Sequence, residues 1–290
     1  MKYISLHLHV SCQDDIRQTV LDLLADAAGE AGCDSFETTS DGINGYAVKG
    51  NFNREAFSAQ LMSFPVNGVK ISYTIEDADD QDWNETWEDA GFSPIIIDDR
   101  IVVYDARHTT TDEAEAFTQP CRIGIEARNA FGTGTHETTQ MVLQTLAQSD
   151  LKGLSVLDCG CGTGILSIAA LKLGAKEATG YDIDEWSVEN AIHNAGLNGV
   201  TDFKGLLGDA TVLQSISEHF DIVVANINRN ILLNDLQAMV LKMDTGSRMI
   251  ISGFYETDCP LLTTKALSLG LRESGRKTQN SWCCLSFIKD

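Results

Sequence analysis

The sequence predicts an α/β protein with a doubly wound, mostly parallel sheet in its C-terminal half and a smaller α+β domain before it. Three observations lead to this prediction. Strand-like and helix-like segments alternate from about Lys152, a glycine-rich turn follows the first of these strands, and the N-terminal segments run in the order β-α-β-β-α-β. Strands that alternate with helices form a parallel sheet covered on both faces. The 290 residues, 43% of them hydrophobic, can bury one large or two medium cores.

The N-terminal segments are typical of a ferredoxin-like domain. Residues 2–10 alternate apolar with polar side chains, as a strand does, and residues 14–31 carry apolar side chains at helical spacing. A strand, a helix and a strand follow at 46–49, 54–62 and 69–77. The second strand of the β-α-β-β-α-β order is poorly marked. The order predicts a small α+β domain at residues 1–78.

An acidic stretch follows and predicts a connecting segment at residues 79–125. Fifteen acidic residues lie between Glu76 and Glu126, against three arginines. We interpret them as a solvated surface, with a basic partner as the alternative. Trp83 and Trp87 have the i, i+4 spacing of a helix and are interpreted as packing residues rather than a ligand site. After Pro94 the letters IIIDDRIVVY predict a strand.

The remaining elements, residues 126–290, build the larger domain. Strands are expected at 154–158, 177–184, 202–210, 221–228 and 247–254, and helices at 165–175, 185–196, 231–243 and 259–270. Two strands close the chain at 271–277 and 281–290. Because only a short turn joins these two, they are expected to pair antiparallel.

Composition and charge exclude several classes of protein. No run of apolar residues reaches the roughly 18 of a membrane span or resembles a signal-peptide core, so we expect a cytoplasmic protein with no membrane contact. The eight cysteines include no CxxC pair, so we expect reduced thiols and no metal site. A net charge of −21 repels phosphate backbones, so no direct nucleic-acid binding is expected.

The letters LDCGCGTG place Gly160, Gly162 and Gly164 directly after a hydrophobic strand, where doubly wound folds bind ligands. Asp182 ends the next strand, 22 residues after Gly160, where a carboxylate can accept hydrogen bonds from both hydroxyls of a ribose. The pair predicts a site for an adenosine-like group. Ile165 stands where a dinucleotide GxGxxG fingerprint needs a small residue, and no GK[ST] of a phosphate-binding loop follows.

The GxGxG turn, the distal acidic residue, the letters GDA after the third strand and the antiparallel final strand together resemble the class I S-adenosylmethionine-dependent methyltransferases. The resemblance implies a seven-stranded methyltransferase sheet and S-adenosyl-L-methionine as cofactor. It also places Asp209, the middle residue of GDA, near the adenine amino group. The alternative for Asp209 is a simple turn former.

Asn226 closes the fourth strand in the letters VVANIN. DNA adenine methyltransferases have a [DN]PPY motif at this place, whose polar residue holds the amine and whose aromatic residue stacks on the flipped base. Here the amine-holding Asn226 is kept while Arg229 replaces the aromatic residue, which favours an aliphatic amine over a nucleobase. The alternative for Asn226 is a strand-end cap.

The letters AFGTGTHETT before the larger domain, and DWNETWEDAGFSPIIIDDRIVV in the connecting segment, resemble the bacterial methyltransferases of large-subunit ribosomal protein L11. The likeness covers essentially the whole chain and is most specific in the catalytic half. Glu88 departs from the basic residue expected after Trp87, which puts any role of that position in orienting domains in doubt. The resemblance further assigns cofactor contacts to Phe131, Thr139, Gly160, Gly162, Asp182, Ile183 and Asn226, with Asn226 also beside the methyl donor and Phe131 in a loop over the cofactor.

The resulting hypothesis is N-methylation of lysine side chains of ribosomal protein L11, with the N-terminal α-amine as a second acceptor. The substrate would be free or ribosome-bound, gripped by the N-terminal domain of a monomeric enzyme. No general base is assigned, and His136 is interpreted as a hydrogen-bonding scaffold, with a base as the alternative. Two other hypotheses remain open. One is a class I methyltransferase for another protein, nucleic acid or small-molecule amine. The other is a non-catalytic nucleoside-binding regulator, against which Asn226 and the AFGTGTHETT stretch argue.

Overall fold

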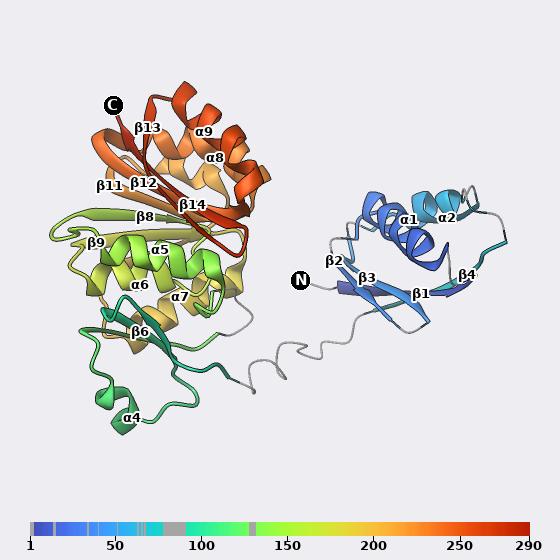
Figure 1. Cartoon of the computed structure of the whole chain (residues 1–290), viewed down its shortest axis with the longest axis horizontal. Helices are drawn as coiled ribbons and strands as arrows, with labels where there is room; N and C mark the ends of the chain where they lie inside the picture. The colour runs from blue at the N-terminus through green and yellow to red at the C-terminus, as the bar shows by residue number, and fades with distance from the viewer. Residues whose placement is uncertain are drawn as a thin grey trace. The chain divides into compact units, whose positions relative to one another are not determined.

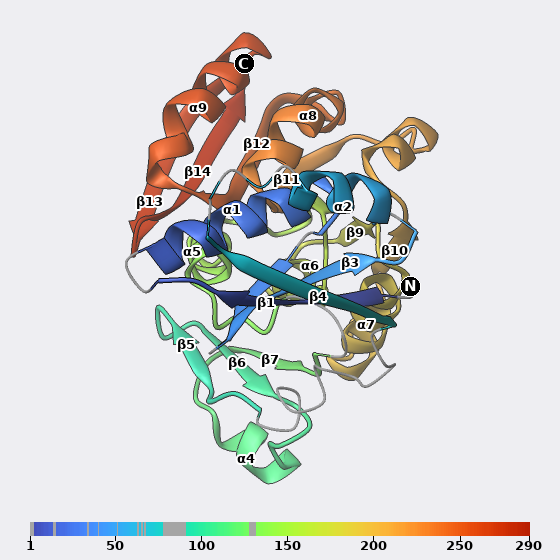
Figure 2. The same cartoon turned by 90° about the vertical axis from the view of Figure 1, so that its right-hand side faces the viewer.

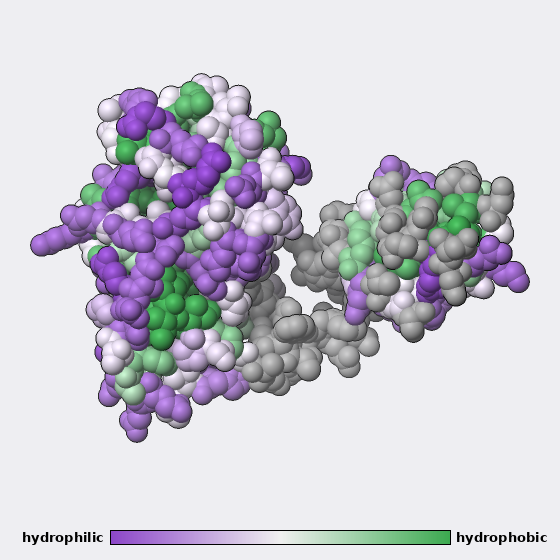
Figure 3. Space-filling view, in the orientation of Figure 1, coloured by the Kyte–Doolittle hydropathy of each residue, from purple (hydrophilic) through white to green (hydrophobic). Residues whose placement is uncertain are grey.

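The computed structural model describes residues 3–13, 16–33, 35–39, 41–50, 52–62, 64, 66, 68–77, 91–127 and 132–290. It divides into two compact units, residues 1–83 and 84–290 (Figure 1). No helix of the described residues is both long and apolar enough to cross a membrane. The face of the larger unit seen in Figure 3 is mainly hydrophilic, in keeping with the excess of acidic residues (42) over basic ones (21).

The N-terminal unit is a four-stranded antiparallel sheet with two helices on one face (Figures 1 and 2). Its elements are β1 (Tyr3–Ser11), α1 (Arg17–Glu30), β2 (Ser35–Thr38), β3 (Gly42–Val48), α2 (Arg54–Met62) and β4 (Lys70–Asp77), in the strand order β2-β3-β1-β4. The alternation of β1 buries Leu6 and Leu8, which pack with Leu24 of α1 and Phe57 of α2 into one core. The weakly marked second strand is β2, a short and polar edge strand.

The larger unit contains a seven-stranded sheet in the order β10-β9-β8-β11-β12-β14-β13. Its strands are β8 (Ser155–Cys159), β9 (Glu177–Asp182), β10 (Phe203–Leu207), β11 (Phe220–Asn226), β12 (Met243–Tyr255), β13 (Leu271–Gln279) and β14 (Trp282–Lys289). The central strands pair in parallel, whereas β14 runs antiparallel to both β12 and β13. This confirms the predicted doubly wound, mostly parallel sheet with an antiparallel last strand.

Alternate residues of each strand face opposite layers of helices. Val156 packs on one side with α5 (Glu137–Ala147), α6 (Ile165–Lys172) and α7 (Glu185–Leu197), while Leu157 packs on the other with α8 (Arg229–Val240) and α9 (Cys259–Ser268). Two short 3₁₀ helices, η2 (Ala210–Ser215) and η3 (Glu256–Asp258), complete the unit. Figure 1 shows α8 and α9 above the strands and α5 and α6 below them. Because helices cover both faces of the sheet, the sequences of its central strands are nearly continuous apolar runs.

The described part of the expected connecting segment is itself folded. It forms β5 (Ile95–Ile97), β6 (Ile101–Asp105), α4 (Thr111–Ala116) and β7 (Cys121–Ile125), a three-stranded sheet that shares its buried residues with α5 and α6. The predicted single strand IIIDDRIVVY is wrong, because the chain reverses at Asp98 and Asp99, both at positive φ (48° and 52°). Aspartate tolerates this conformation better than most residues. By packing, residues 91–125 therefore go with the larger unit.

Candidate active site

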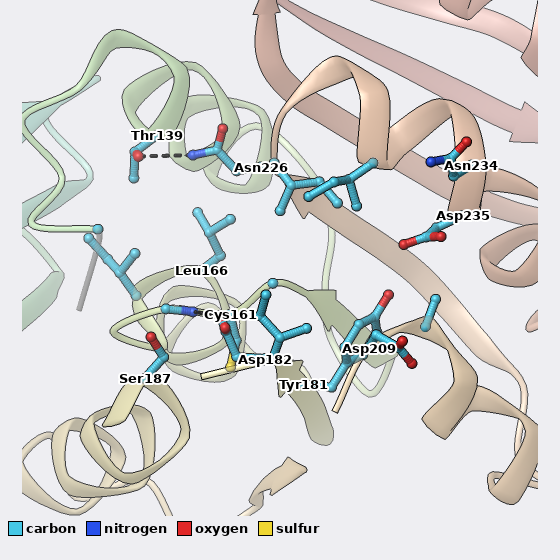
Figure 4. Close-up of a pocket in the computed structure, with 18 residues that line it drawn as sticks. Thr139, Cys161, Leu166, Tyr181, Asp182, Ser187, Asp209, Asn226, Asn234 and Asp235 are labelled. Carbon is cyan, nitrogen blue, oxygen red and sulfur yellow. Dashed lines mark hydrogen bonds between the residues drawn. The ribbon is translucent and has the colours of Figure 1, made fainter. Parts of the chain in front are cut away.

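A cavity of about 580 Å³ opens at the carboxyl ends of the parallel strands. Doubly wound sheets bind their ligands at this edge, and the volume lies within the range of small-molecule sites. Figure 4 draws its lining residues, which are Gly132, Thr139, Gly160, Cys161, Gly162, Ile165, Leu166, Tyr181, Asp182, Ile183, Ser187, Asp209, Ala210, Asn226, Ile227, Ile231, Asn234 and Asp235. Seven of the eight residues assigned from sequence are among them. The eighth, Phe131, lies outside the described residues, as do Trp83, Trp87 and Glu88.

The glycine turn between β8 and α6 adopts a conformation that few other residues tolerate. Gly160, Gly162 and Gly164 have φ values of 74°, 52° and 78°. The backbone N–H groups of Gly160 and Cys161 both donate to the carbonyl of Tyr181 on the neighbouring strand, which fixes the turn against β9. The missing side chain of Gly160 also matters, because a Cβ there would lie 2.4 Å from Cγ2 of Ile227 on the facing wall.

We expect Gly160→Ala to weaken both folding and cofactor binding. Gly153 is a matched control, because its φ of 75° is nearly the same and an added Cβ would meet nothing within 4 Å. Gly153→Ala should lower the free energy of unfolding by about 1–2 kcal/mol, the cost of a left-handed alanine. Gly160→Ala should add a loss of cofactor affinity of about 10-fold, because Ile227 must move within the wall of the cavity. Calorimetry and denaturation measure both quantities. Equal cofactor affinity in the two variants would show that the close contact between Gly160 and Ile227 does not matter for cofactor binding.

Asp182 ends β9 and points its carboxylate at the glycine turn. One oxygen accepts the N–H of Gly162 at 2.9 Å and the other accepts the N–H of Asp184 at 3.2 Å. Each carboxylate oxygen has a second lone pair, so the group can still accept hydrogen bonds from a ligand. Figure 4 shows Asp182 facing the cavity below Leu166. The glycine turn and Asp182, the two features recognised from sequence, are therefore joined by a direct hydrogen bond from Gly162.

Asp158 lies beneath the glycine turn and is fully buried. One oxygen accepts from the backbone N–H (3.1 Å) and hydroxyl (2.7 Å) of Ser167, while the other has no partner among the described residues. Burial raises the pKa of Asp158 to about 6, helped by the charge of Asp182 and opposed by the hydrogen bonds from Ser167. The carboxylate is therefore an internal charge that the folded protein tolerates at a cost.

Replacement of Asp158 by asparagine should flatten part of the pH dependence of stability. Because the pKa of Asp158 is higher in the folded than in the unfolded chain, the folded state binds the proton more tightly, and this stabilisation is lost as the pH rises through about 6. From pH 5 to pH 7 the wild type should lose about 1 kcal/mol relative to Asp158→Asn. Chemical denaturation at the two pH values measures the difference. A difference that does not change with pH would contradict this assignment.

Asn226 and Thr139 meet at one side of the cavity. The amide nitrogen of Asn226, at the end of β11, donates to the hydroxyl of Thr139 on α5 at 3.0 Å, the dashed line in Figure 4. Thr139 is 1% exposed, and the amide oxygen of Asn226 is buried with no partner among the described residues. The helix that follows is capped by Asn228, which accepts the N–H of Ile231. Asn226 therefore keeps an unsatisfied acceptor beside the cavity.

Asp209 serves two purposes at the opposite side of the drawn cavity (Figure 4). It caps η2 by accepting from Thr211, whose hydroxyl and N–H lower the pKa of the Asp209 carboxyl, and it also lines the cavity. Asn234 and Asp235 of α8 stand nearby and were not identified from sequence. Ile231 and Asp235 share one face of α8, which begins at Arg229, but this spacing alone does not indicate which face meets the cavity.

His136 acts as a scaffold at the start of α5. Its Nδ1 accepts the N–H of Thr138 as the helix cap, and its ring packs edge-on against Trp282, with centroids 4.8 Å apart. A nitrogen occupied in this way is a poor candidate for a base. Residues 132–137, together with Thr139, line a second cavity of about 340 Å³ that shares Gly132 and Thr139 with the first.

Comparisons with known proteins agree with one another. A family model described as ribosomal protein L11 methyltransferase (PrmA) matches residues 8–290. The ribosomal protein L11 methyltransferase of Bacteroides fragilis is 45% identical over 271 residues, which cover 93% of this chain and 95% of the relative. That of Porphyromonas gingivalis is 39% identical over 292 residues, covering 100% and 99%. The crystal structure of a ribosomal protein L11 methylase from Lactobacillus delbrueckii subsp. bulgaricus aligns with a TM-score of 0.60 and 26% identity, covering 69% of this chain and 100% of that one.

Proposed function

The chain belongs to the ribosomal protein L11 methyltransferase family, and on that premise we propose that it transfers methyl groups from S-adenosyl-L-methionine to amines of ribosomal protein L11. The acceptors are lysine side chains and the N-terminal α-amine. The observation that carries the choice of an amine is the buried, unpartnered oxygen of Asn226 beside the cavity. An orphaned buried acceptor is costly, and the N–H group of an amine satisfies it.

The cavity fits S-adenosyl-L-methionine on three counts. The glycine turn leaves room for close approach, Asp182 retains lone pairs for ribose hydroxyls, and apolar walls of Ile165, Leu166 and Ile183 suit an adenosine. When bound, this cofactor supplies an electrophilic methyl group on a sulfonium. The proposed cofactor contacts are the residues assigned from sequence. They are Phe131, Thr139, Gly160, Gly162, Asp182, Ile183, Asp209 and Asn226.

The protein contributes mainly position and desolvation. The amide oxygen of Asn226 orients the acceptor amine by accepting a hydrogen bond from one of its N–H groups. Thr139 holds the amide of Asn226 in place. A free lysine has a pKa near 10.4, so the amine must enter neutral, which a water-poor cavity favours. No histidine or lysine is among the described residues that line the main cavity, so we assign no general base and expect the proton to leave to water.

The N-terminal unit is proposed to be a ferredoxin-like module that grips the substrate protein. Its strand order β2-β3-β1-β4, with neighbours antiparallel, supports this assignment. The net charge of −21 favours a basic protein partner over nucleic acid. We propose the boundaries 1–78, 79–125 and 126–290 for the recognition domain, connecting segment and catalytic domain, with residues 91–125 of the connecting segment packed on the catalytic domain. We further propose a monomer that works in the cytoplasm alongside its ribosomal substrate.

Labelled methyl transfer tests this function directly. The full-length protein is incubated with radiolabelled S-adenosyl-L-methionine and purified L11, with another basic ribosomal protein of similar size as the matched control. We expect label in L11 alone, and mass spectrometry should locate it on lysine Nζ atoms or the N-terminal amine. If the cofactor binds and both proteins stay unlabelled, the L11 amine assignment is wrong. Label on a non-amine atom would overturn the role given to Asn226.

A further inference from the structure

The strand β7 leads toward the active site, and its last residues are held by a row of asparagines on α7. Asn190 and Asn194 of α7 and Asn198, its C-cap, stand four residues apart, so they project from one side of the helix. Asn198 both donates to the carbonyl and accepts from the N–H of Gly124, at 2.7 and 3.0 Å. These bonds replace those that a further strand would make with the edge of the sheet β5-β6-β7.

Two of the same asparagines also hold Glu126, the residue that follows β7. Asn194 accepts the N–H of Glu126 at 3.0 Å, and the amide nitrogens of Asn190 and Asn194 both donate to its carbonyl. His193 meets the Glu126 carboxylate at 2.9 Å. Asn194 is 0% exposed and Asn190 is 4% exposed, so loss of these bonds would leave buried amide groups unpaired, which is costly. Glu126 is therefore held against α7 by several hydrogen bonds.

Asn194 also reaches into the glycine turn. Its amide nitrogen donates to the carbonyl of Thr163 at 3.0 Å, within the letters GCGTG. The hydroxyl of Thr163 in turn donates to the carbonyl of Gly132 at 2.6 Å. Gly132 has a φ of 115°, and a Cβ on it would lie 2.9 Å from the Thr163 oxygen, so the approach is close. Thr163 thus links the glycine turn to both Glu126 and Gly132.

We propose that Thr163 is a positioning residue that couples the glycine turn to the wall shared by the two active-site cavities. Gly132 lines both the 580 Å³ cavity and the adjoining 340 Å³ cavity, and its carbonyl is held by a side chain of the turn itself. Cofactor bound at the glycine turn therefore affects the position of Gly132, in the wall between the two cavities, through the hydroxyl of Thr163. The inference rests on the proposed function, which assigns the turn to the cofactor. It adds that the adjoining cavity lies on the acceptor side, because Thr139, which holds Asn226, lines that cavity too.

Thr163→Val removes the hydroxyl and keeps the shape of the side chain. We expect kcat for L11 methylation to fall by about 10-fold to 100-fold, since small misplacements of reacting groups have effects of this size. The Kd of S-adenosylhomocysteine, read by calorimetry, should stay within about threefold, because the backbone of the turn is unchanged. Thr163→Ser restores the hydroxyl and should recover most of kcat. Thr264→Val is the matched control, because it also removes a hydroxyl bonded to a backbone carbonyl (2.7 Å), on α9 away from the cavities.

Hydrogen exchange supplies a readout that needs no catalysis. In the wild type, S-adenosylhomocysteine should protect amides of residues 132–135, and this added protection should vanish in Thr163→Val while persisting in Thr163→Ser and Thr264→Val. Unchanged protection in Thr163→Val would overturn the coupling. So would a loss of kcat matched by an equal loss of cofactor affinity and of thermal stability, which indicates a structural role alone. Failure of the wild type to bind S-adenosylhomocysteine would instead refute the proposed function.

Discussion

Asn226→Ala is expected to lower kcat for methyl transfer by at least about 100-fold, while the Kd of the cofactor changes by less than about threefold. The variant removes the one buried amide oxygen beside the cavity that has no partner among the described residues. An interaction made only with the correctly placed amine affects turnover and spares binding of the other substrate. Steady-state kinetics with L11, together with calorimetry on S-adenosylhomocysteine, separates the two quantities.

Two further variants sharpen this prediction. Thr139→Val removes the acceptor of the Asn226 amide nitrogen, so the amide should lose its orientation and kcat should fall by about 10-fold, less than in Asn226→Ala. Asn230→Ala is the matched control, an exposed asparagine at the start of α8 that does not line the cavity. It should leave turnover unchanged. Near wild-type turnover in Asn226→Ala would show that the amine is oriented by another group.

The fold could be predicted where sequence pattern and burial coincide. In the larger unit, apolar strands such as Ile222 to Ala225 are covered on both faces, so the apolar run itself predicts a buried strand. Prediction failed where two residues reverse the chain direction. Asp98 and Asp99 lie inside a run of isoleucines and valines, and their positive φ angles depend on the hairpin between β5 and β6. The helix α4 was also missed, although Thr110 and Glu113 form a capping box, a pattern that indicates the start of a helix.

The candidate site shows the same division. Gly160, Asp182 and Asn226 were identified because each closes or follows a strand at the ligand-binding edge, which is a rule of topology. Asp235 was missed because it belongs to the middle of a helix, and only the packing of α8 over η2 brings it to the cavity. The contacts of Thr163 with Gly132 and Asn194 join residues 31 positions away in either direction. No local pattern carries such information.

Asp182 is the residue whose loss should weaken cofactor binding most. Its carboxylate already aligns the glycine turn through Gly162 and its own loop through Asp184, and its remaining lone pairs face the cavity. Removal therefore takes away two things together, the acceptors for the ribose and the alignment of the turn. Hydrogen bonds to a charged group contribute about 1.5–3 kcal/mol each, so two of them correspond to at least about a 100-fold change in affinity.

We therefore expect Asp182→Ala to raise the Kd of S-adenosylmethionine by at least about 100-fold. At saturating cofactor, kcat should fall by less than about 10-fold, because the amine is oriented from Asn226 on another strand. Asp150→Ala is the matched control, because Asp150 also accepts an N–H two residues ahead at 3.2 Å, that of Lys152, at an exposed turn. Its Kd should not change. Calorimetry on all three proteins decides the matter, since an unchanged Kd in Asp182→Ala would place the ribose elsewhere, and an equal loss of affinity in Asp150→Ala would trace the effect to the fold.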